Sequence, residues 1–300
     1  MLNRVDRVQL TARDAGAVAG RWVELLDARI LDTDDVAPLN ARRVTIQVGD
    51  CLVEVLEPSG DGYVADHLNS GRGGPLSIGV TTDDPDALRK RLIDLGIEAV
   101  DCAEQLFLHE SQLRIPGLNM VVSAESARAP VGLMRNLYEA THLTSEVEDA
   151  AADLARIFDL NAGSFVPIRS EQYGYDGVLT LFDSGSLDRV EMIHPYDQSK
   201  TMGRFFDRFG PCLYMCYGET DQLGEIRDRL TELAPDSWTG SDENDDGLFL
   251  HPKALGGVML GVSRTSHAWT WSGYPERRIP LPNERSNEPS EEQTGEQSDE

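Results

Sequence analysis

The segment Leu106-Phe-Leu-His109 recurs later in the chain as Leu248-Phe-Leu-His251. Three more segments recur in the same order, with all offsets between 132 and 142 residues: Gly74-Pro75 as Gly210-Pro211, Val53–Pro58 as Val190–Pro195, and Arg4–Thr11 as Asn136–Thr144. Matches in one order at nearly one spacing are typical of a duplicated structural unit. The sequence therefore predicts two domains of the same fold.

Each half of the chain divides again. Residues 2–13 read as a strand, residues 15–27 have helical periodicity, and residues 43–48 and 51–56 alternate around a Gly49-Asp50 turn. The same order returns three times. The predicted elements are a strand at 75–81, a helix at 84–96 and strands at 105–109 and 118–124; then a strand at 137–144, a helix at 146–160 and strands near 177–183 and 188–193; then a strand at 211–218, a helix at 221–234 and strands at 247–251 and 257–263.

Composition and charge exclude several classes of protein. The 300 residues are 40% hydrophobic, and 52 acidic against 27 basic residues give a net charge of −25. Such a charge repels phosphate backbones and anionic lipid, so we expect no nucleic-acid or membrane partner. The N-terminus shows no secretory signal, no apolar run approaches a membrane span, and the four cysteines are scattered. A reduced, cytoplasmic protein is the expectation.

The duplication sets the predicted boundaries. We expect an N-terminal domain at residues 1–125, a linker at 126–133 and a C-terminal domain at 134–265. Residues 266–282 form a C-terminal extension, whose aromatic segment 268–275 wraps back on the domains or covers a homodimer interface. The remaining residues, 283–300, read as an acidic, disordered tail. Phe205, Phe206 and Phe209 predict a short helix that closes a core.

Three segments resemble a known family. Leu248–Leu260 resembles the strand-turn-strand ending of methylmalonyl-CoA epimerases, Val53–Pro58 resembles their fourth strand, and Trp22–Asp27 resembles the end of their first helix. Together with the repeat, they make the chain similar to the vicinal oxygen chelate superfamily, which includes glyoxalase I and extradiol dioxygenases. The resemblance implies an α+β fold of two tandem vicinal oxygen chelate domains, each of two βαβββ modules that form a cupped mixed sheet.

The family binds a divalent metal at the centre of each cup. Its ligand positions fall here on Arg7, Glu54, Ser77 and Val122 in the first domain and on Glu139, Glu191, Leu213 and Gly261 in the second. An arginine, alkyl groups and a glycine supply no metal ligand. We therefore expect no metal site and assign no cofactor, although a divalent metal is typical of the family.

Glu139 and Glu191 are the predicted catalytic residues. If both face the cup, proximity of like charges and partial burial raise the pKa of one carboxyl, which then serves as a general base near neutral pH. The alternative is that each carboxylate is neutralised by an arginine such as Arg169 or Arg189 and is structural.

Further residues are candidates for substrate binding. Arg7 and Glu54 either bind an oxygenated substrate or pair with each other. The other predicted binding residues are Thr141, Arg169, Tyr173, Tyr175 and His194. His142 falls near a ligand position, but in the ungapped register it lies on the opposite face of its strand from Glu139 and reads as a core or interface residue.

The resemblance favours a small-molecule enzyme that abstracts a proton next to a carbonyl, as an isomerase, epimerase or lyase does. One alternative is a non-catalytic acidic protein that sequesters a cationic molecule, as bleomycin-resistance proteins do. A second is an enzyme similar to extradiol dioxygenases, if the ligand register is shifted. A small molecule is the expected partner in each case, and a homodimer stays open.

Overall fold

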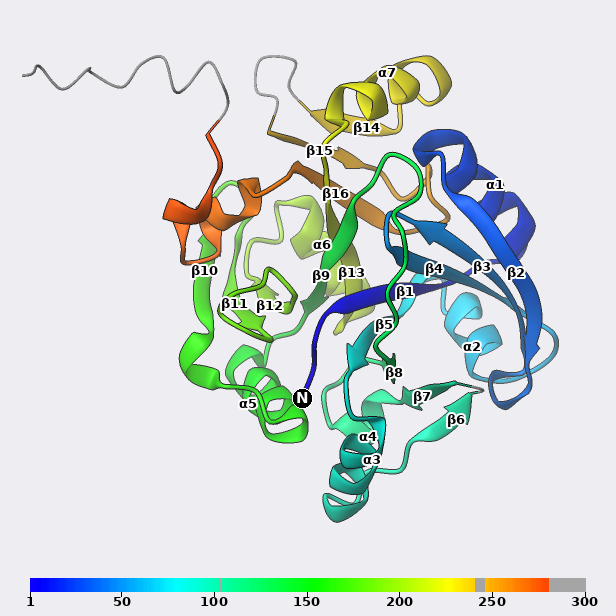
Figure 1. Cartoon of the computed structure of the whole chain (residues 1–300), viewed down its shortest axis with the longest axis vertical. Coiled ribbons are helices and arrows are strands. Elements are labelled where there is room, and N and C mark those ends of the chain that lie inside the picture. The colour runs from blue at the N-terminus through cyan, green and yellow to red at the C-terminus, as the bar shows by residue number, and fades with distance from the viewer. Residues whose placement is uncertain (103, 241–245, 281–300) are drawn as a thin grey trace, which may run out of the picture.

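The computed structural model describes residues 1–102, 104–240 and 246–280. Two eight-stranded mixed sheets form its framework (Figure 1). The first sheet contains β1 (Val5–Thr11), β2 (Arg29–Val36), β3 (Ala41–Val48), β4 (Cys51–Pro58), β5 (Gly74–Thr82), β6 (Val100–Cys102), β7 (Gln105–Leu108) and β8 (Met120–Ala124). The second contains β9 (Asn136–Leu143), β10 (Val166–Ser170), β11 (Tyr175–Leu181), β12 (Arg189–Pro195), β13 (Cys212–Thr220), β14 (Trp238–Gly240), β15 (Gly247–Leu250) and β16 (Met259–Arg264).

Both sheets have the same strand order. The first runs β2-β3-β4-β1-β5-β8-β7-β6 and the second β10-β11-β12-β9-β13-β16-β15-β14. In the first sheet, β1 lies parallel to β4 and antiparallel to β5; β9 has the same relation to β12 and β13. Each sheet is therefore two βαβββ modules joined through their first strands. The predicted fold class is confirmed.

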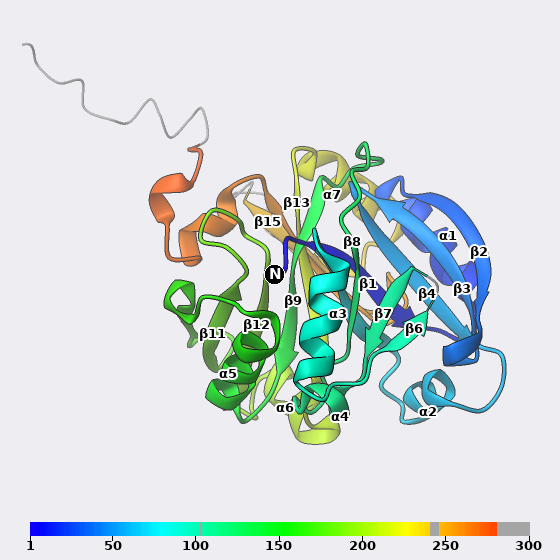
Figure 2. The same cartoon turned by 60° about the horizontal axis from the view of Figure 1, so that its bottom comes forward.

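One long helix follows the first strand of each module. These helices are α1 (Ala15–Leu26), α3 (Pro85–Asp94), α5 (Val147–Phe158) and α7 (Leu223–Leu233). Asp14 and Asp84 cap the first two, because each carboxylate accepts a hydrogen bond from a backbone N–H of the first turn. Apolar residues of all four helices and of both sheets belong to a single core cluster. Helix α1 packs against α7 and α3 against α5, so the two halves share this core (Figure 2).

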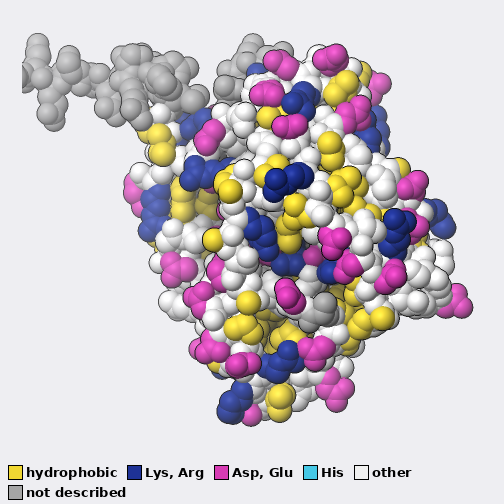
Figure 3. All heavy atoms as spheres, turned by 45° about the vertical axis from the view of Figure 1, so that its right-hand side comes forward, with side chains coloured by type: hydrophobic (Ala, Val, Ile, Leu, Met, Phe, Trp, Pro, Cys, Tyr) yellow, Lys and Arg dark blue, Asp and Glu magenta, His cyan; other side chains and the backbone are white. Residues whose placement is uncertain are grey.

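The remaining helices are short. They are α2 (Tyr63–Asn69), α4 (Glu110–Leu113), α6 (Thr201–Phe209) and four 3₁₀ segments at 37–39, 162–164, 267–271 and 275–277. Helix α6 is the predicted helix at the Phe205 segment. In the described ranges, no helix is both long and apolar enough to span a membrane. Acidic and basic side chains are interspersed on the face shown in Figure 3.

The sequence missed four strands: β2, β6, β10 and β14. All four lie at the outer edges of the sheets. Strand β2 is almost entirely exposed, and the other three are short and partly exposed. Alternation of apolar and polar residues arises only where one face of a strand is buried, so β2, β6 and β14 leave no period-two pattern. Strand β10 alternates in exposure, but it has only five residues and contains Pro167.

Candidate functional site

The predicted site residues Arg7, Glu54, Glu139 and Glu191 lie on the faces of the two sheets that point away from the shared core. Against the second sheet lies a cavity of about 1150 Å³. Most of its lining comes from the second domain, but the first domain contributes a wall from α2, the loop before β5 and the turn around α4. The first-domain lining residues are Tyr63, His67, Arg72, Gly73, Pro75, Leu76, Glu110, Gly117 and Asn119. The cavity therefore lies where the two domains meet.

Glu139 on β9 lines the cavity but is already paired. Arg189, at the start of β12, donates a hydrogen bond of 2.6 Å from Nε to Glu139 Oε2. Arg189 is fully buried, and its guanidinium stacks on the Tyr138 ring at 5.1 Å. The cross-strand register places Arg189 directly beside Glu139. Glu139 is therefore paired with Arg189, as in the second of the two readings that the sequence left open.

Glu191, two residues further along β12, has a different environment. Its Oε2 accepts a 2.7 Å hydrogen bond from the Thr141 hydroxyl, and that hydroxyl also lies 3.4 Å from Glu139 Oε1. Within the described part of the chain, no cationic side chain lies within ion-pair distance of Glu191. Burial and the adjacent Glu139 raise the pKa of Glu191 to about 8. Glu191 is thus a carboxyl that takes up and releases a proton near neutral pH.

Two tyrosine hydroxyls lie near this carboxyl. Tyr175 on β11 and Tyr217 on β13 both line the cavity. Burial raises the pKa of each phenol, and Glu191 and Glu139 raise it further. Both phenols therefore remain protonated, and neither has a hydrogen-bond partner among the residues that the structure describes. They are available to donate to an oxygen of a bound molecule.

The remaining predicted binding residues of the second domain make other contacts. Arg169 and Tyr173 line the cavity; Arg169 stacks on Tyr196 at 5.8 Å, and Tyr173 packs edge-on against Phe249. His194 does not line the cavity, and its ring packs against Phe206 at 6.3 Å.

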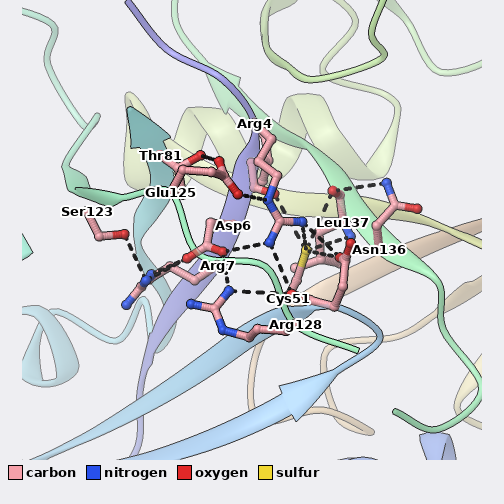
Figure 4. Close-up of polar contacts among 12 residues, drawn as sticks. Arg4, Asp6, Arg7, Cys51, Thr81, Ser123, Glu125, Arg128, Asn136 and Leu137 are labelled. Carbon is pink, nitrogen blue, oxygen red and sulfur yellow. Dashed lines mark hydrogen bonds and ion pairs between the residues drawn. The ribbon is translucent and has the colours of Figure 1, made fainter. Parts of the chain in front are cut away.

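In the first domain, Arg7 and Glu54 form a closed polar cluster outside that cavity. Arg7 donates to Asp6 at 2.5 Å and to Ser123 at 2.9 Å (Figure 4). It also donates to Glu54 at 2.7 Å. Gln105 and Gln9 complete the hydrogen bonds of the Glu54 carboxylate, at 2.6 and 2.8 Å. The two residues pair with each other, and their polar atoms are used within the chain.

The structure corrects two of the transferred ligand positions. Val122 and Leu213 belong to the shared core. Ser123, next to Val122, accepts a hydrogen bond from Arg7 on the other face of the first sheet. Met215, two residues after Leu213, belongs to a separate apolar cluster and lines the cavity. A register shift in β13 between Leu213 and Met215 moves the inward positions by one residue. His142 is buried outside the cavity lining, with its Nε2 2.9 Å from the Pro116 carbonyl oxygen.

The residues at the family's metal positions do not fit a metal. In the second domain, Arg189 holds the Glu139 carboxylate, and the Tyr217 ring covers Gly261. In the first, Arg7 and two glutamine amides saturate Glu54. Nowhere in the described ranges do three His, Cys, Asp or Glu side chains gather as metal ligands. A guanidinium beside the carboxylate opposes a second cation there.

Sequence reasoning missed the first-domain wall, as well as Tyr217 and Phe249. No local pattern points to the wall, because it depends on how the domains pack. Trp271, in the C-terminal extension, lines the cavity, so part of the aromatic segment 268–275 wraps back on the second domain. Its ring lies 6.4 Å from that of Tyr217.

Comparison with known proteins supports the fold. No family model and no curated protein matches the sequence. A variant of 4-hydroxymandelate synthase from Streptomyces coelicolor has a similar structure, with a TM-score of 0.65, 14% identity, and coverage of 88% of this chain and 93% of that chain. Methylmalonyl-CoA epimerases from Streptomyces coelicolor and Mycobacterium tuberculosis match at 20% and 19% identity with TM-scores of 0.37, covering 42% and 44% of this chain and 100% and 89% of theirs.

The first of these likenesses spans both domains and nearly the whole of each chain. At 14% identity it shows the fold and no activity. The chain has the tandem vicinal oxygen chelate fold that the sequence resemblance implied.

Proposed function

We propose that the protein is an enzyme that moves a proton at a carbon next to a carbonyl group, as an isomerase, epimerase or lyase, and that Glu191 carries the proton. The observation that carries the proposal is a buried carboxyl at the cavity wall whose hydrogen-bond partner is a hydroxyl and not a cation. Such a group exchanges a proton with a ligand at little cost, because its charge is not already held by an ion pair.

The neighbours of Glu191 suit this chemistry. In its ionised form, Glu191 takes the proton from the carbon, and the electron pair moves to the carbonyl oxygen as an enolate. The Tyr175 and Tyr217 hydroxyls donate hydrogen bonds to that oxygen. Glu191 then returns the proton to the same carbon or to another carbon of the conjugated system. Glu139, held by Arg189, positions Thr141 and keeps a negative charge beside Glu191.

The test is hydrogen exchange in D₂O. Loss of the acetyl proton NMR signal of 2-acetylnaphthalene and 6-acetyl-2-naphthoate reports proton abstraction next to a carbonyl. We expect exchange above the buffer rate with the native chain, and a reduction of at least about 100-fold in Glu191→Gln. Glu219→Gln is the matched control, because Glu219 is a buried carboxylate on β13 outside the cavity lining.

The same assay addresses the alternatives. Binding of these ketones without exchange would favour a sequestering protein. The described cavity lining contains as many basic as acidic residues, namely Arg72, Arg169, Lys200 and Lys253 against Glu110, Glu139, Glu191 and Asp246. This balance does not favour a cationic ligand. The placement of His142 outside the lining does not support the dioxygenase alternative.

A further inference from the structure

Arg72 stands out among the cations of the cavity. It is partly buried and lines the cavity from the first domain, in the loop between α2 and β5. Within the described residues its guanidinium makes no hydrogen bond and no ion pair; only its backbone N–H donates, to the Ser70 hydroxyl. This guanidinium has lost part of its water shell, and no carboxylate of the described chain replaces the lost hydrogen bonds. An anionic oxygen group of a ligand would supply them.

The loop that carries Arg72 is fixed against the second domain. Gly73 and Gly74 adopt left-handed backbone conformations, with φ of 51° and 81°. A Cβ atom at Gly74 would overlap the carbonyl group of Gly257. The backbone of the first domain therefore meets that of the second at this point, so the position of Arg72 is set by the domain interface.

Strand β13 gives the distance between Arg72 and the pair Glu139 and Glu191. Arg72 acts electrostatically on Cys212, at the start of β13. Three residues further along the strand, Met215 pairs with Thr141, the residue that also lies beside Glu191. The register shift between Leu213 and Met215 makes this step two residues long on β9 and three on β13. At about 3.3 Å per residue, Cys212 and the level of Glu191 are therefore roughly 7–10 Å apart along the strands.

The wall between these two points is aromatic and apolar. Phe205, Tyr214 and Met215 belong to one cluster, in which the rings of Phe205 and Tyr214 lie 5.1 Å apart. All three line the cavity. Such a wall packs well against the faces and edges of a flat aromatic ring. An extended polar ligand would find no hydrogen-bond partners along it.

From these observations we infer that Arg72 binds the carboxylate of an aromatic acid whose ring system lies along β13 and whose reacting carbon, roughly 7–10 Å away, reaches Glu191. The substrate class is an aromatic carboxylic acid with a carbonyl substituent at the far end. The part of this inference that concerns the reacting carbon rests on the proposed function; the part that concerns Arg72 does not. One guanidinium neutralises one negative charge, which favours a carboxylate over a phosphate dianion.

The experiment compares ligands that differ only in charge. Rigid 6-acetyl-2-naphthoate and its neutral isostere 6-acetyl-2-naphthamide are titrated into the full chain by isothermal calorimetry. We expect the carboxylate to bind at least tenfold more tightly than the amide. In Arg72→Gln this ratio falls below threefold, and Arg72→Lys keeps part of it because the charge remains without the planar fork.

Two variants test whether the effect belongs to Arg72. Arg42→Gln removes an exposed arginine of the first domain outside the cavity, and Lys253→Gln removes a cation of the cavity rim. Both are expected to keep the tenfold preference. Loss of the preference in Lys253→Gln but not in Arg72→Gln would overturn the assignment, as would absence of binding at 5 mM or equal affinity of acid and amide. A tenfold preference for 6-acetyl-2-naphthyl phosphate over the acid would overturn the carboxylate assignment.

The inference and the proposed function fail separately. Glu191→Gln is expected to retain the preference for the acid over the amide, because Arg72 is unchanged. If the preference depends on Arg72 but the native chain exchanges no acetyl protons, the proposed function is wrong and the binding assignment stands. If acetyl protons exchange through Glu191 but Arg72→Gln leaves the preference intact, the reverse holds.

Discussion

Arg189 and Glu139 form a buried ion pair on adjacent strands, with Nε and Oε2 2.6 Å apart, directly beside a second carboxyl that has no such partner. The two glutamates thus have different environments: Glu139 is ion-paired with Arg189, whereas burial and the adjacent Glu139 raise the pKa of Glu191. A buried carboxyl whose pKa is raised toward neutrality, in a cavity and beside a second acidic group, is typical of sites for proton transfer.

The ion pair predicts a stability effect with a specific rescue. Arg189→Met leaves the Glu139 charge buried without a partner, so the free energy of unfolding should fall by about 3–5 kcal/mol. Adding Glu139→Gln removes that charge and should restore part of the loss. Urea unfolding of the single and double variants measures both values. A double variant no more stable than Arg189→Met would contradict this account of the pair.

The raised pKa of Glu191 predicts how stability changes with pH. In the unfolded chain a glutamate has a pKa of about 4.3, and in the fold that of Glu191 is about 8. Between these values the native state binds more protons than the unfolded state, so this group lowers the free energy of unfolding as pH rises from about 4.5 to about 8. Its stabilising contribution is fully present below pH 4 and lost above pH 8.

Glu191→Gln removes this dependence. The variant should therefore gain stability relative to the native chain as pH increases through that window, with a constant difference above pH 8. Each unit of pKa separation corresponds to about 1.4 kcal/mol, which urea unfolding at pH 5, 7 and 9 readily resolves. A stability difference that does not vary between pH 5 and 9 would show that Glu191 titrates normally.

The two free hydroxyls predict a graded loss of activity. Tyr175→Phe and Tyr217→Phe each remove one donor to the developing enolate, so each should slow acetyl-proton exchange by about 10- to 100-fold. Tyr173→Phe is the control, since the Tyr173 side chain is exposed and its ring packs against Phe249. Exchange rates at saturating ketone check the effect. If all three variants exchange at the native rate, the oxyanion is not bound by these phenols.

The sequence predicted the parts of the structure that depend on local periodicity. Glu139 and Glu191 fall on two ligand positions of the superfamily that the chain resembles, and the period-two alternation of side chains along a strand places each of them on the same face as those ligands. The duplication located the strands that carry them. A local register shift defeats the same reasoning, as it does at Leu213, where β13 and β9 slip by one residue.

Features that arise from domain packing leave no such pattern. Arg72 reads in the sequence as a loop arginine among glycines, and its place in the cavity depends on how the first domain packs on the second. Arg7 shows the converse. Its position at the centre of the first sheet could be predicted, but the serine and glutamine partners that close the cluster depend on tertiary contacts over large sequence separations.

The close approach of Gly74 and Gly257 predicts that one methyl group at the domain interface affects both stability and binding. Gly74→Ala adds a Cβ atom at a left-handed φ of 81° and against the Gly257 carbonyl. Gly96→Ala imposes the left-handed conformation alone, at φ 69° and with no atom within 4 Å of the added Cβ. Left-handed backbone costs about 1–2 kcal/mol for a residue with a side chain, and overpacking adds about 1–3 kcal/mol.

We therefore expect Gly74→Ala to be less stable than Gly96→Ala by at least about 1 kcal/mol in urea unfolding. Because Arg72 lies two residues from Gly74, the shift should also weaken the affinity for 6-acetyl-2-naphthoate several-fold, while Gly96→Ala binds as the native chain does. Calorimetry on both variants decides the second point. Equal stability and equal affinity of the two variants would mean that the domains yield at this contact and that it does not position Arg72.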